Sequence, residues 1–126
     1  MSVGRGTEKA FQCFGHPNIV VDAMSFTFTP VYAIQKGKKC RGVDLSSAPL
    51  DQVRQRGIDL NYIITAYKAM NLGNFFFSPF FEKLIGVDYV REMILQNKSA
   101  DEIKAMWAQD VEEFKERRKP YLLYKE

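Results

Sequence analysis

Residues 25–31 of the chain read Ser-Phe-Thr-Phe-Thr-Pro-Val, and this stretch decides between an all-helical and a mixed fold. Phe26 and Phe28 alternate with small polar residues, which is the period-two pattern of a half-buried β-strand. Pro30 ends the pattern because proline has no backbone N–H to donate to a neighbouring strand. The stretch therefore predicts a β-strand with one apolar face.

The residues on either side of this strand extend the prediction to a small sheet. A second strand is predicted over residues 39–46, where Val43 and Leu45 share one face. Gly42 inside it indicates a bulge or a close approach of two backbones. Upstream, the Gly-His-Pro-Asn stretch at residues 15–18 has the composition of a turn. The N-terminal half is therefore expected to consist of short strands joined by loops.

The apolar spacing becomes helical in the second half of the chain. Apolar residues recur three and four positions apart, and glycine or proline follows most of these runs. Ser99 and Glu102 match a capping box, which indicates the start of the longest helix, and Pro120 ends that helix. Helices are expected to begin near Pro49, Asp59, Ser78, Val87 and Ser99, the last of them burying a stripe of Ile103, Met106, Trp107, Val111 and Phe114.

Strands followed by helices predict an α+β fold, in which a small sheet from the N-terminal half is covered by several helices from the C-terminal half. The chain has 126 residues, which is enough to bury one core and too few for two ordinary cores. Neither an internal repeat nor a linker divides the sequence. A single domain over residues 1–126 is therefore expected.

The composition excludes several classes of protein. A hydrophobic fraction of 46%, a charged fraction of 26% and a mean hydropathy of -0.26 are typical of a soluble globular domain. No run approaches the ~20 apolar residues that a membrane span needs, and the first residues hold no apolar signal-peptide core. The net charge of +3 rests mainly on residues 36–41 and 117–119, without the dense basic face of a nucleic-acid binder. No nucleic-acid partner is expected.

Groups that carry catalytic or metal-binding chemistry are sparse. His16 is the only histidine, so the chain offers neither a pair of imidazoles nor a histidine-rich metal site, and a local bond in the turn before Pro17 is the preferred role. The predicted sheet region carries few carboxylates, so an acid pair for self-sufficient catalysis is not expected. Cys13 and Cys40 are too few for a disulfide scaffold, and their pairing stays open. No metal or cofactor is predicted.

The segment Gly4-Arg5-Gly6-Thr7 is the most unusual local motif. It lacks both the Gly-Lys-Ser/Thr ending of a Walker loop and the spacing of a dinucleotide fingerprint. Arginine between glycines presents a planar, bidentate donor to a carboxylate or phosphate, so anion binding and a plain turn both stay open. Such loops usually follow a strand that holds them still, and no strand is predicted ahead of this one.

Aromatic residues gather at residues 75–81 and again at residues 121–124. The first group is expected to lie mainly in the core. Phe76 and Phe80, together with the C-terminal tyrosines and leucines, are candidates for a docking surface, because aromatic side chains are enriched in buried interfaces.

Taken in order, the motifs of the chain resemble the C-terminal part of the NamZ-type exo-β-N-acetylmuramidases, also known as the DUF1343 family. Each motif alone is weak, but their order is specific and the resemblance runs over essentially the whole chain. The motifs are GRGTEKAFQCFGHP at residues 4–17, FTFTP at 26–30, KGKKCRGVDL at 36–45, FFEKLIG at 80–86, VREMI at 90–94 and FKERRKPYLLY at 114–124.

The resemblance implies a larger N-terminal Rossmann-like domain ahead of this segment, with the substrate cleft between the two domains. The family's Glu-Gly-Thr stretch, which directly precedes the glycine–arginine motif, is absent here. The implied reaction is the hydrolytic release of N-acetylmuramic acid from peptidoglycan fragments, in bacterial cell wall recycling. The principal acid would lie on the absent domain, and the chain alone is expected to be inactive. A periplasmic or extracellular location follows from the same resemblance.

The resemblance also marks candidate substrate-binding residues. Arg5, Gly6 and Thr7 match the family's Gly-Arg-Gly-Thr motif, and Arg5 is expected to meet the lactyl carboxylate of the substrate or to orient a catalytic carboxylate. Thr29 matches the FTFTP motif, Cys40 and Gly42 match the KGKKCRGVDL motif, and all three are additional cleft candidates. His16 stands where relatives more often carry a small residue.

The predicted function is therefore that of an accessory domain, forming one wall of the cleft of a muramidase-like glycoside hydrolase. An isolated chain is expected to expose apolar surface and to self-associate. The alternative is a stand-alone module that binds anionic glycans or other acidic partners through Arg5 and the basic residues 36–41.

Overall fold

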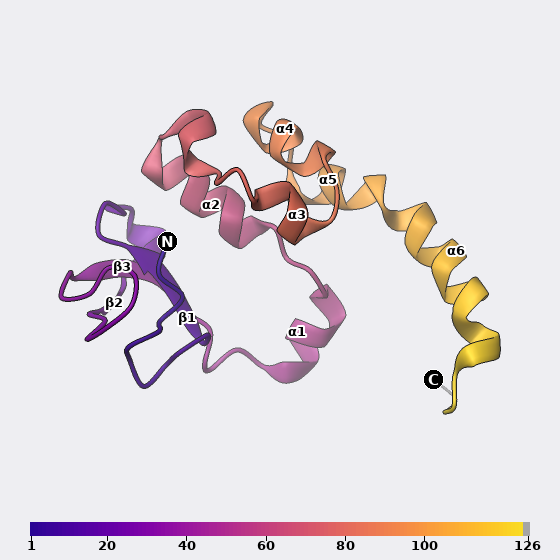
Figure 1. The fold of residues 1–126 in the computed structure, drawn as a ribbon, viewed down its shortest axis with the longest axis horizontal. Helices are drawn as coiled ribbons and strands as arrows, with labels where there is room; N and C mark the ends of the chain where they lie inside the picture. The colour runs from indigo at the N-terminus through magenta and orange to yellow at the C-terminus, as the bar shows by residue number, and fades with distance from the viewer. Residues whose placement is uncertain (125–126) are drawn as a thin grey trace. The chain divides into compact units, whose positions relative to one another are not determined.

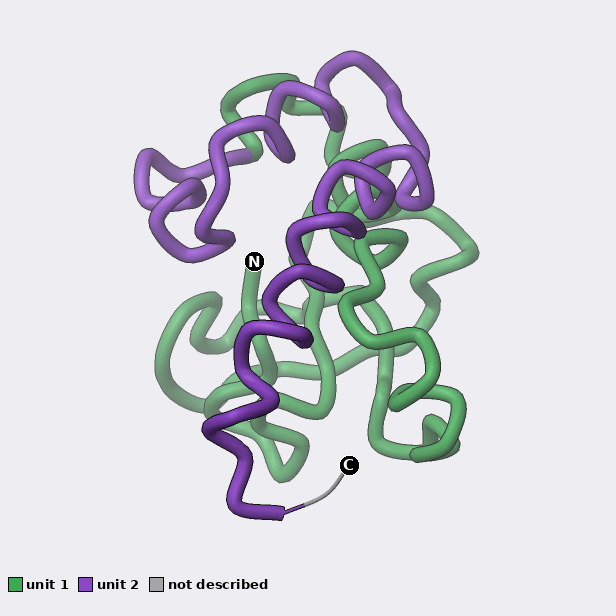
Figure 2. The backbone as a smooth tube through the Cα atoms, turned by 90° about the vertical axis from the view of Figure 1, so that its right-hand side faces the viewer, with its two compact units in different colours: residues 1–76 green, residues 77–126 purple. Residues whose placement is uncertain are grey.

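The computed structural model describes residues 1–124, and Figure 1 shows the order of its helices and strands. The chain divides into two compact units, Met1–Phe76 and Phe77–Glu126, which Figure 2 draws in different colours. The first unit holds the sheet and the second is helical; the single-domain organisation stays a prediction. Across residues 1–124, no helix combines the length and the apolar character that crossing a bilayer requires.

The sheet is antiparallel and has three strands in the order β1-β3-β2 (Figure 1). Both strands predicted from the sequence are present, although each is shorter than expected: β2 spans Phe26–Phe28 and β3 spans Cys40–Asp44. The third strand, β1, spans Cys13–His16, so the first two residues of the predicted turn are a strand instead. The turn itself follows at Pro17 and Asn18, closed by a bond of 3.2 Å from the Ile19 N–H to the carbonyl oxygen of His16. With the helices that follow, the sheet confirms the α+β class.

The register explains why β1 forms in spite of its composition. Gly15 lies opposite Gly42, and a Cβ atom added at Gly42 would stand 1.8 Å from the carbonyl oxygen of Phe14. The two backbones therefore approach so closely that only glycine fits, which confirms the close approach predicted at Gly42. Cross-strand pairing overrides the turn tendency of the local sequence.

One face of the sheet packs against helix α2, which spans Asn61–Met70. Ile19, Met24 and Ala66 form the buried centre of this core, and Phe14 and Val43 contribute from the sheet. Since alternate residues of a strand point to one face, Phe14 of β1 and Val43 of β3, which lie opposite each other, reach the same core. A short helix η1, Asp22–Met24, lies against β3 and carries Met24 into this core.

The other face of the sheet is smaller and carries both cysteines. Cys13, Phe28 and Cys40 form its buried cluster, with Phe26 packed against them. Gly4 lies directly over this cluster, since a Cβ atom there would stand 2.6 Å from the Cys13 sulfur. The N-terminal segment therefore covers the face of the sheet that α2 leaves open.

The first unit also contains two short helical elements at its end, α1 at Leu50–Arg56 and η2 at Gly73–Phe76. Leu50 and Val53 of α1 share a face as predicted from their spacing, but both side chains are exposed. Asp59 does not occupy the N-cap position of α2, which is Leu60; its carboxylate instead accepts a hydrogen bond from the backbone N–H of Asn61 at 2.9 Å.

The second unit consists of a series of short helices. In chain order the helices are α3 at Phe81–Ile85, α4 at Tyr89–Leu95, α5 at Ala100–Met106, α6 at Ala108–Arg118 and η3 at Lys119–Tyr121. Arg91 of α4 connects this helix to α3, because it donates to Glu82 at 2.6 Å. It also donates to the carbonyl oxygen of Ser78 at 3.0 Å, and its guanidinium lies over the Phe77 ring.

The predicted capping box is confirmed at the start of α5. The Ser99 hydroxyl accepts from the Glu102 backbone N–H at 3.2 Å, and the Glu102 carboxylate accepts from the Ser99 N–H at 2.8 Å. The single long helix predicted after it is wrong, since the chain breaks at Trp107 into α5 and α6. The apolar stripe is buried only at Ile103, whereas Met106, Val111 and Phe114 are exposed in the chain as described.

Candidate functional site

The glycine–arginine motif forms a tight turn whose polar groups are used internally. The Thr7 backbone N–H and its hydroxyl both donate to the carbonyl oxygen of Gly4, at 3.0 and 2.7 Å. The same hydroxyl accepts from the Lys9 backbone N–H at 3.1 Å. Gly4 and Gly6 have φ angles of 74° and 83°, which other residues adopt only with strain. Thr7 therefore fixes the turn and leaves Arg5 as its exposed side chain.

The turn is anchored on the sheet by backbone hydrogen bonds within the chain. Ser2 and Gly15 exchange both backbone hydrogen bonds, at 2.8 and 2.9 Å, which pairs the first residues with the edge of β1. On the far side of the turn, the Phe11 N–H donates to the carbonyl oxygen of Val3 at 2.8 Å. Both ends of the loop are therefore held.

A second loop, residues 30–37, lies against the first. The Val31 N–H donates to the carbonyl oxygen of Gly6 at 2.9 Å, and a Cβ atom at Gly6 would stand 2.6 Å from the carbonyl oxygen of Tyr32. The loop is closed at its base by a bond of 2.8 Å from the Gly37 N–H to Pro30. Thr29 precedes this loop and is exposed. The structure thus brings the Arg5, Gly6, Thr7 and Thr29 segments to one region of the first unit.

Arg5 itself lies over an aromatic ring. Its guanidinium carbon is 5.0 Å from the centre of the Phe11 ring, which is the distance of a cation–π contact. Within residues 1–124, no carboxylate pairs with this guanidinium. Its edge N–H groups are therefore available to a ligand that carries a carboxylate.

A lysine clamp joins the loop to the central strand. The Lys9 ammonium donates to the Asp44 carboxylate and to the Ser46 hydroxyl, each at 2.6 Å, and lies 5.7 Å from the centre of the Phe26 ring. The hydrogen bond from Lys9, supported by those from Ser46, lowers the pKa of Asp44 to about 2. The sequence does not indicate this clamp, because Lys9 and Asp44 are 35 positions apart.

The clamp predicts a specific pH dependence of stability. The folded-state pKa of Asp44 lies below its unfolded value, so its stabilising effect is complete above about pH 4 and is lost as the pH falls toward 2. Asp44→Asn removes the effect. We therefore expect the urea midpoints of the wild type and Asp44→Asn to differ at pH 6 and to converge near pH 2. A difference that is unchanged between the two pH values would contradict the assignment.

Cys40 and Gly42 are buried within the sheet, beneath the loops rather than on the surface. Both cysteines are free thiols in the structure. Cys13 lies opposite Asp44, and Cys40 is four residues from Asp44 along β3, or about 13 Å at the usual rise of a strand, which exceeds the separation a disulfide bridges. The substrate-binding roles predicted for Cys40 and Gly42 stay predictions.

His16 makes a local hydrogen bond, as predicted from its position before Pro17. Its Nδ1 atom accepts a hydrogen bond from the Asn18 backbone N–H at 3.1 Å, and burial lowers its pKa. In the part of the chain that the structure describes, no group of three or more histidine, cysteine, aspartate or glutamate side chains is placed to hold a metal ion.

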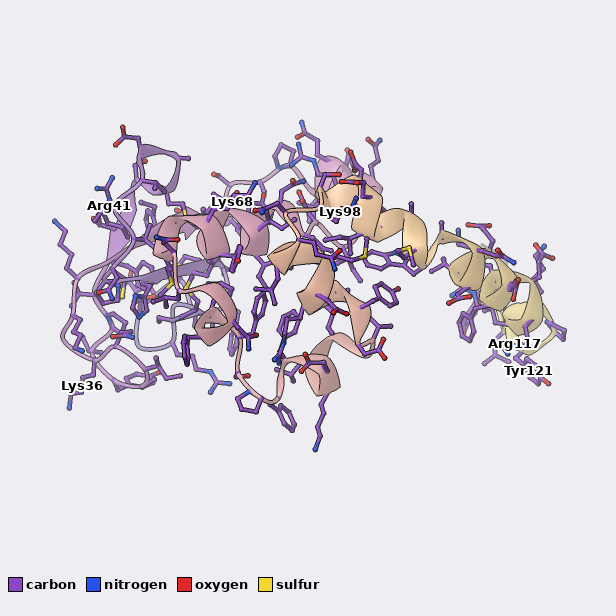
Figure 3. The ribbon with its side chains drawn as sticks, turned by 90° about the horizontal axis from the view of Figure 1, so that it is seen from above. Lys36, Arg41, Lys68, Lys98, Arg117 and Tyr121 are labelled. Carbon is purple, nitrogen blue, oxygen red and sulfur yellow. The ribbon has the colours of Figure 1, made fainter. Side chains whose placement is uncertain are left out.

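The two ends of the basic stretch, Lys36 and Arg41, lie apart (Figure 3). Arg41 lies on β3, and its guanidinium is 3.9 Å from the Asp22 carboxylate. Lys36 belongs to the loop beside Gly6, and Figure 3 shows the two labelled side chains at well-separated places. The aromatic run also divides, since Phe77 is buried whereas Phe75 and Phe80 are 93% and 55% exposed.

One hollow of about 200 Å³ was not predicted from the sequence. It lies in the first unit between α1 and the start of α2, and Arg56 approaches Asp59 at 3.8 Å on its wall. Its lining residues are Ala48, Pro49, Gln52, Val53, Arg56, Gly57, Asp59 and Tyr62.

The family described as "Exo-beta-N-acetylmuramidase NamZ, C-terminal" matches residues 1–124. The chain belongs to this family, which confirms the resemblance drawn from its motifs.

Two relatives show the extent of the likeness. The chain is 28% identical over 140 residues to the peptidoglycan beta-N-acetylmuramidase NamZ of Bacillus subtilis, covering 98% of the chain and 34% of the relative. It is 50% identical to the crystal structure of a DUF1343 family protein from Bacteroides fragilis, with a TM-score of 0.92, covering 99% of the chain and 36% of that protein. The chain thus spans about a third of the length of these relatives.

Proposed function

We propose that this chain forms one wall of the substrate cleft of a peptidoglycan glycoside hydrolase, and that the cleft receives a muropeptide or another glycan that ends in N-acetylmuramic acid. The observation that carries the proposal is Arg5, an exposed guanidinium on a loop held at both ends, with no carboxylate partner within residues 1–124. Muramic acid differs from glucosamine by its lactyl carboxylate, which matches the bidentate donor of arginine.

The other predicted site residues support this wall in different ways. Thr7 fixes the turn through its hydroxyl, and Gly6 allows the second loop to lie close. Thr29 is exposed beside that loop and is proposed to contact the glycan. Cys40 and Gly42 are proposed to shape the wall from beneath, since both are buried in the sheet.

The decisive acid is proposed to lie on a Rossmann-like domain that precedes the chain in a longer protein. The length of the relatives supports this, because the chain covers only 34% and 36% of them. Large apolar side chains exposed in the second unit, among them Val111, Phe114, Tyr121 and Leu123, are proposed to be covered by that domain, and by self-association when it is absent. Action in bacterial cell wall recycling, in the periplasm or outside the cell, is part of the same proposal.

A domain exchange tests the proposed function. The C-terminal third of the Bacillus subtilis relative is replaced by this chain, and release of a chromogenic aglycone from an N-acetylmuramic acid glycoside is measured. The chimera is expected to hydrolyse the glycoside, whereas the truncated relative and the isolated chain are not. Arg5→Ala is expected to lower kcat/KM of the chimera about tenfold or more, the loss of one charge-assisted contact.

The matched control is Arg54→Ala, which removes an exposed arginine of α1. This variant is expected to keep the activity of the chimera. A folded chimera without activity, or equal losses for the Arg5 and Arg54 variants, would contradict the proposal.

A stand-alone module for anionic glycans is the second candidate. It is favoured by the position of Lys36, on the loop whose Val31 N–H bonds to Gly6 next to Arg5. Binding of an acidic glycan by the isolated chain that weakens steeply with salt, together with an inactive chimera, would support this candidate over the first.

A further inference from the structure

Phe11 has two unusual properties in the structure. Its side chain is 67% exposed, and its φ angle is 63°, in the left-handed region that bulky residues rarely adopt. The hydrogen bond from its N–H to Val3, at 2.8 Å, holds this conformation together with the bond of 3.0 Å from the Gln12 N–H to Lys9. The fold therefore maintains a strained backbone that presents an aromatic ring to solvent.

The neighbouring loop shows the same strain. Of the five non-glycine residues with positive φ in residues 1–124, three lie in these two adjoining loops: Phe11, Ala33 at 68° and Gln35 at 65°. Strained conformations of this kind persist where the surrounding structure enforces them, and they cluster at ligand-binding sites. The bond from Val31 to Gly6 joins the two loops, so the strained positions belong to one region.

The ring and the guanidinium act as a pair. The guanidinium carbon of Arg5 lies 5.0 Å from the centre of the Phe11 ring, within cation–π distance, and no carboxylate of residues 1–124 pairs with its N–H groups. The exposed part of the ring offers an apolar surface beside those donors. The pair therefore suits a ligand that carries a carboxylate next to a face of C–H bonds.

We propose that Phe11 is the platform on which the pyranose ring of an N-acetylmuramic acid residue packs, while Arg5 binds the lactyl carboxylate. The inference rests on the proposed function and adds to it a division of roles. Phe11 binds the sugar ring, which glucosamine and muramic acid share, and Arg5 distinguishes muramic acid by its carboxylate. The exposed ring explains why the fold keeps a phenylalanine in a left-handed conformation.

The test measures sugar binding to the isolated chain by ¹H–¹⁵N NMR, with N-acetylmuramic acid and N-acetylglucosamine as probes. The wild type is expected to bind N-acetylmuramic acid more tightly. Phe11→Leu keeps an apolar side chain without the ring and is expected to weaken N-acetylmuramic acid binding about fivefold, the effect of one aromatic stacking contact. Arg5→Gln is expected to remove the preference for N-acetylmuramic acid over N-acetylglucosamine.

Two further variants separate a binding role from a structural one. Phe11→Tyr keeps the ring and is expected to bind as the wild type does. Phe75→Leu removes another ring of the first unit, 93% exposed and distant in sequence from the loops, and is expected to change nothing. The NMR spectra of all variants report whether they fold.

The outcomes distinguish this inference from the proposed function. Wild-type binding that is unchanged in Phe11→Leu, or equally lost in Phe11→Tyr, would overturn the role of Phe11 and leave the proposed function standing. Absence of any N-acetylmuramic acid binding by the wild type, up to the solubility of the sugar, would also overturn the role of Phe11, whereas the proposed function is decided by the activity of the chimera.

Discussion

Gly42→Ala is expected to lower the free energy of unfolding by about 3 kcal/mol, or to prevent folding. The added Cβ atom would stand 1.8 Å from the carbonyl oxygen of Phe14 and 2.6 Å from the Cα atom of Gly15. These are backbone atoms of β1, so relief requires the strand itself to move away from β3. The displacement would break hydrogen bonds of the ladder and disturb both faces of the sheet at once.

Urea denaturation followed by circular dichroism measures the loss. Gly37→Ala is the control, because a Cβ atom there meets no atom within 4 Å while the φ angle of 69° still strains an alanine. This control is expected to lose only about 1 kcal/mol, the cost of the backbone conformation. If both variants lose the same amount, close approach of the strands is not the reason for glycine at position 42.

Ile19→Ala is expected to cost about 3 kcal/mol, within the range for truncating a buried isoleucine. The side chain is fully buried between the sheet and α2, in the core that contains Met24 and Ala66. Truncation removes apolar contacts and leaves a cavity, since interior packing relaxes only in part. The loss is expected in the urea midpoint at unchanged slope.

The adjacent residue provides the matched control. Val20 is 72% exposed, and Val20→Ala is expected to change the free energy of unfolding by less than about 0.5 kcal/mol. A difference of less than 1 kcal/mol between the Ile19 and Val20 variants would show that this core does not hold α2 on the sheet.

The elements that the sequence predicts correctly are those with local signals. Phe26 and Phe28 alternate on β2, the glycines at positions 57 and 86 follow α1 and α3, and the capping box of Ser99 opens α5. Each signal acts over a few residues, so it survives without knowledge of the tertiary fold.

The errors arise where distant contacts decide. Gly15 and His16 have turn composition but belong to β1, because they pair with Gly42 and Arg41 of β3. The sequence around Trp107 contains no glycine or proline, so it does not indicate the break between α5 and α6. Val111 and Phe114 are exposed, although their helical spacing predicted a buried apolar stripe. The spacing identifies the apolar face of a helix but not the surface that covers it.

The sequence indicates the charged residue of the candidate site, Arg5, but not its aromatic neighbour, Phe11. Arg5 stands out in the sequence because glycines flank it, a pattern that predicts an exposed turn. Phe11 does not, since phenylalanine normally indicates a core position and the sign of its φ angle cannot be inferred from its type. Its exposed position becomes visible only in the structure, through the bond to Val3 and the contact with Arg5.

The two buried thiols have a practical consequence for spectroscopy. Cys13 and Cys40 are 2% and 0% exposed, and burial raises the pKa of both, so neither is expected to react with a maleimide dye at neutral pH. A single cysteine introduced at an exposed position such as Val20 would then carry the label alone. A fluorescent label could therefore be attached beside the loops without first replacing Cys13 and Cys40.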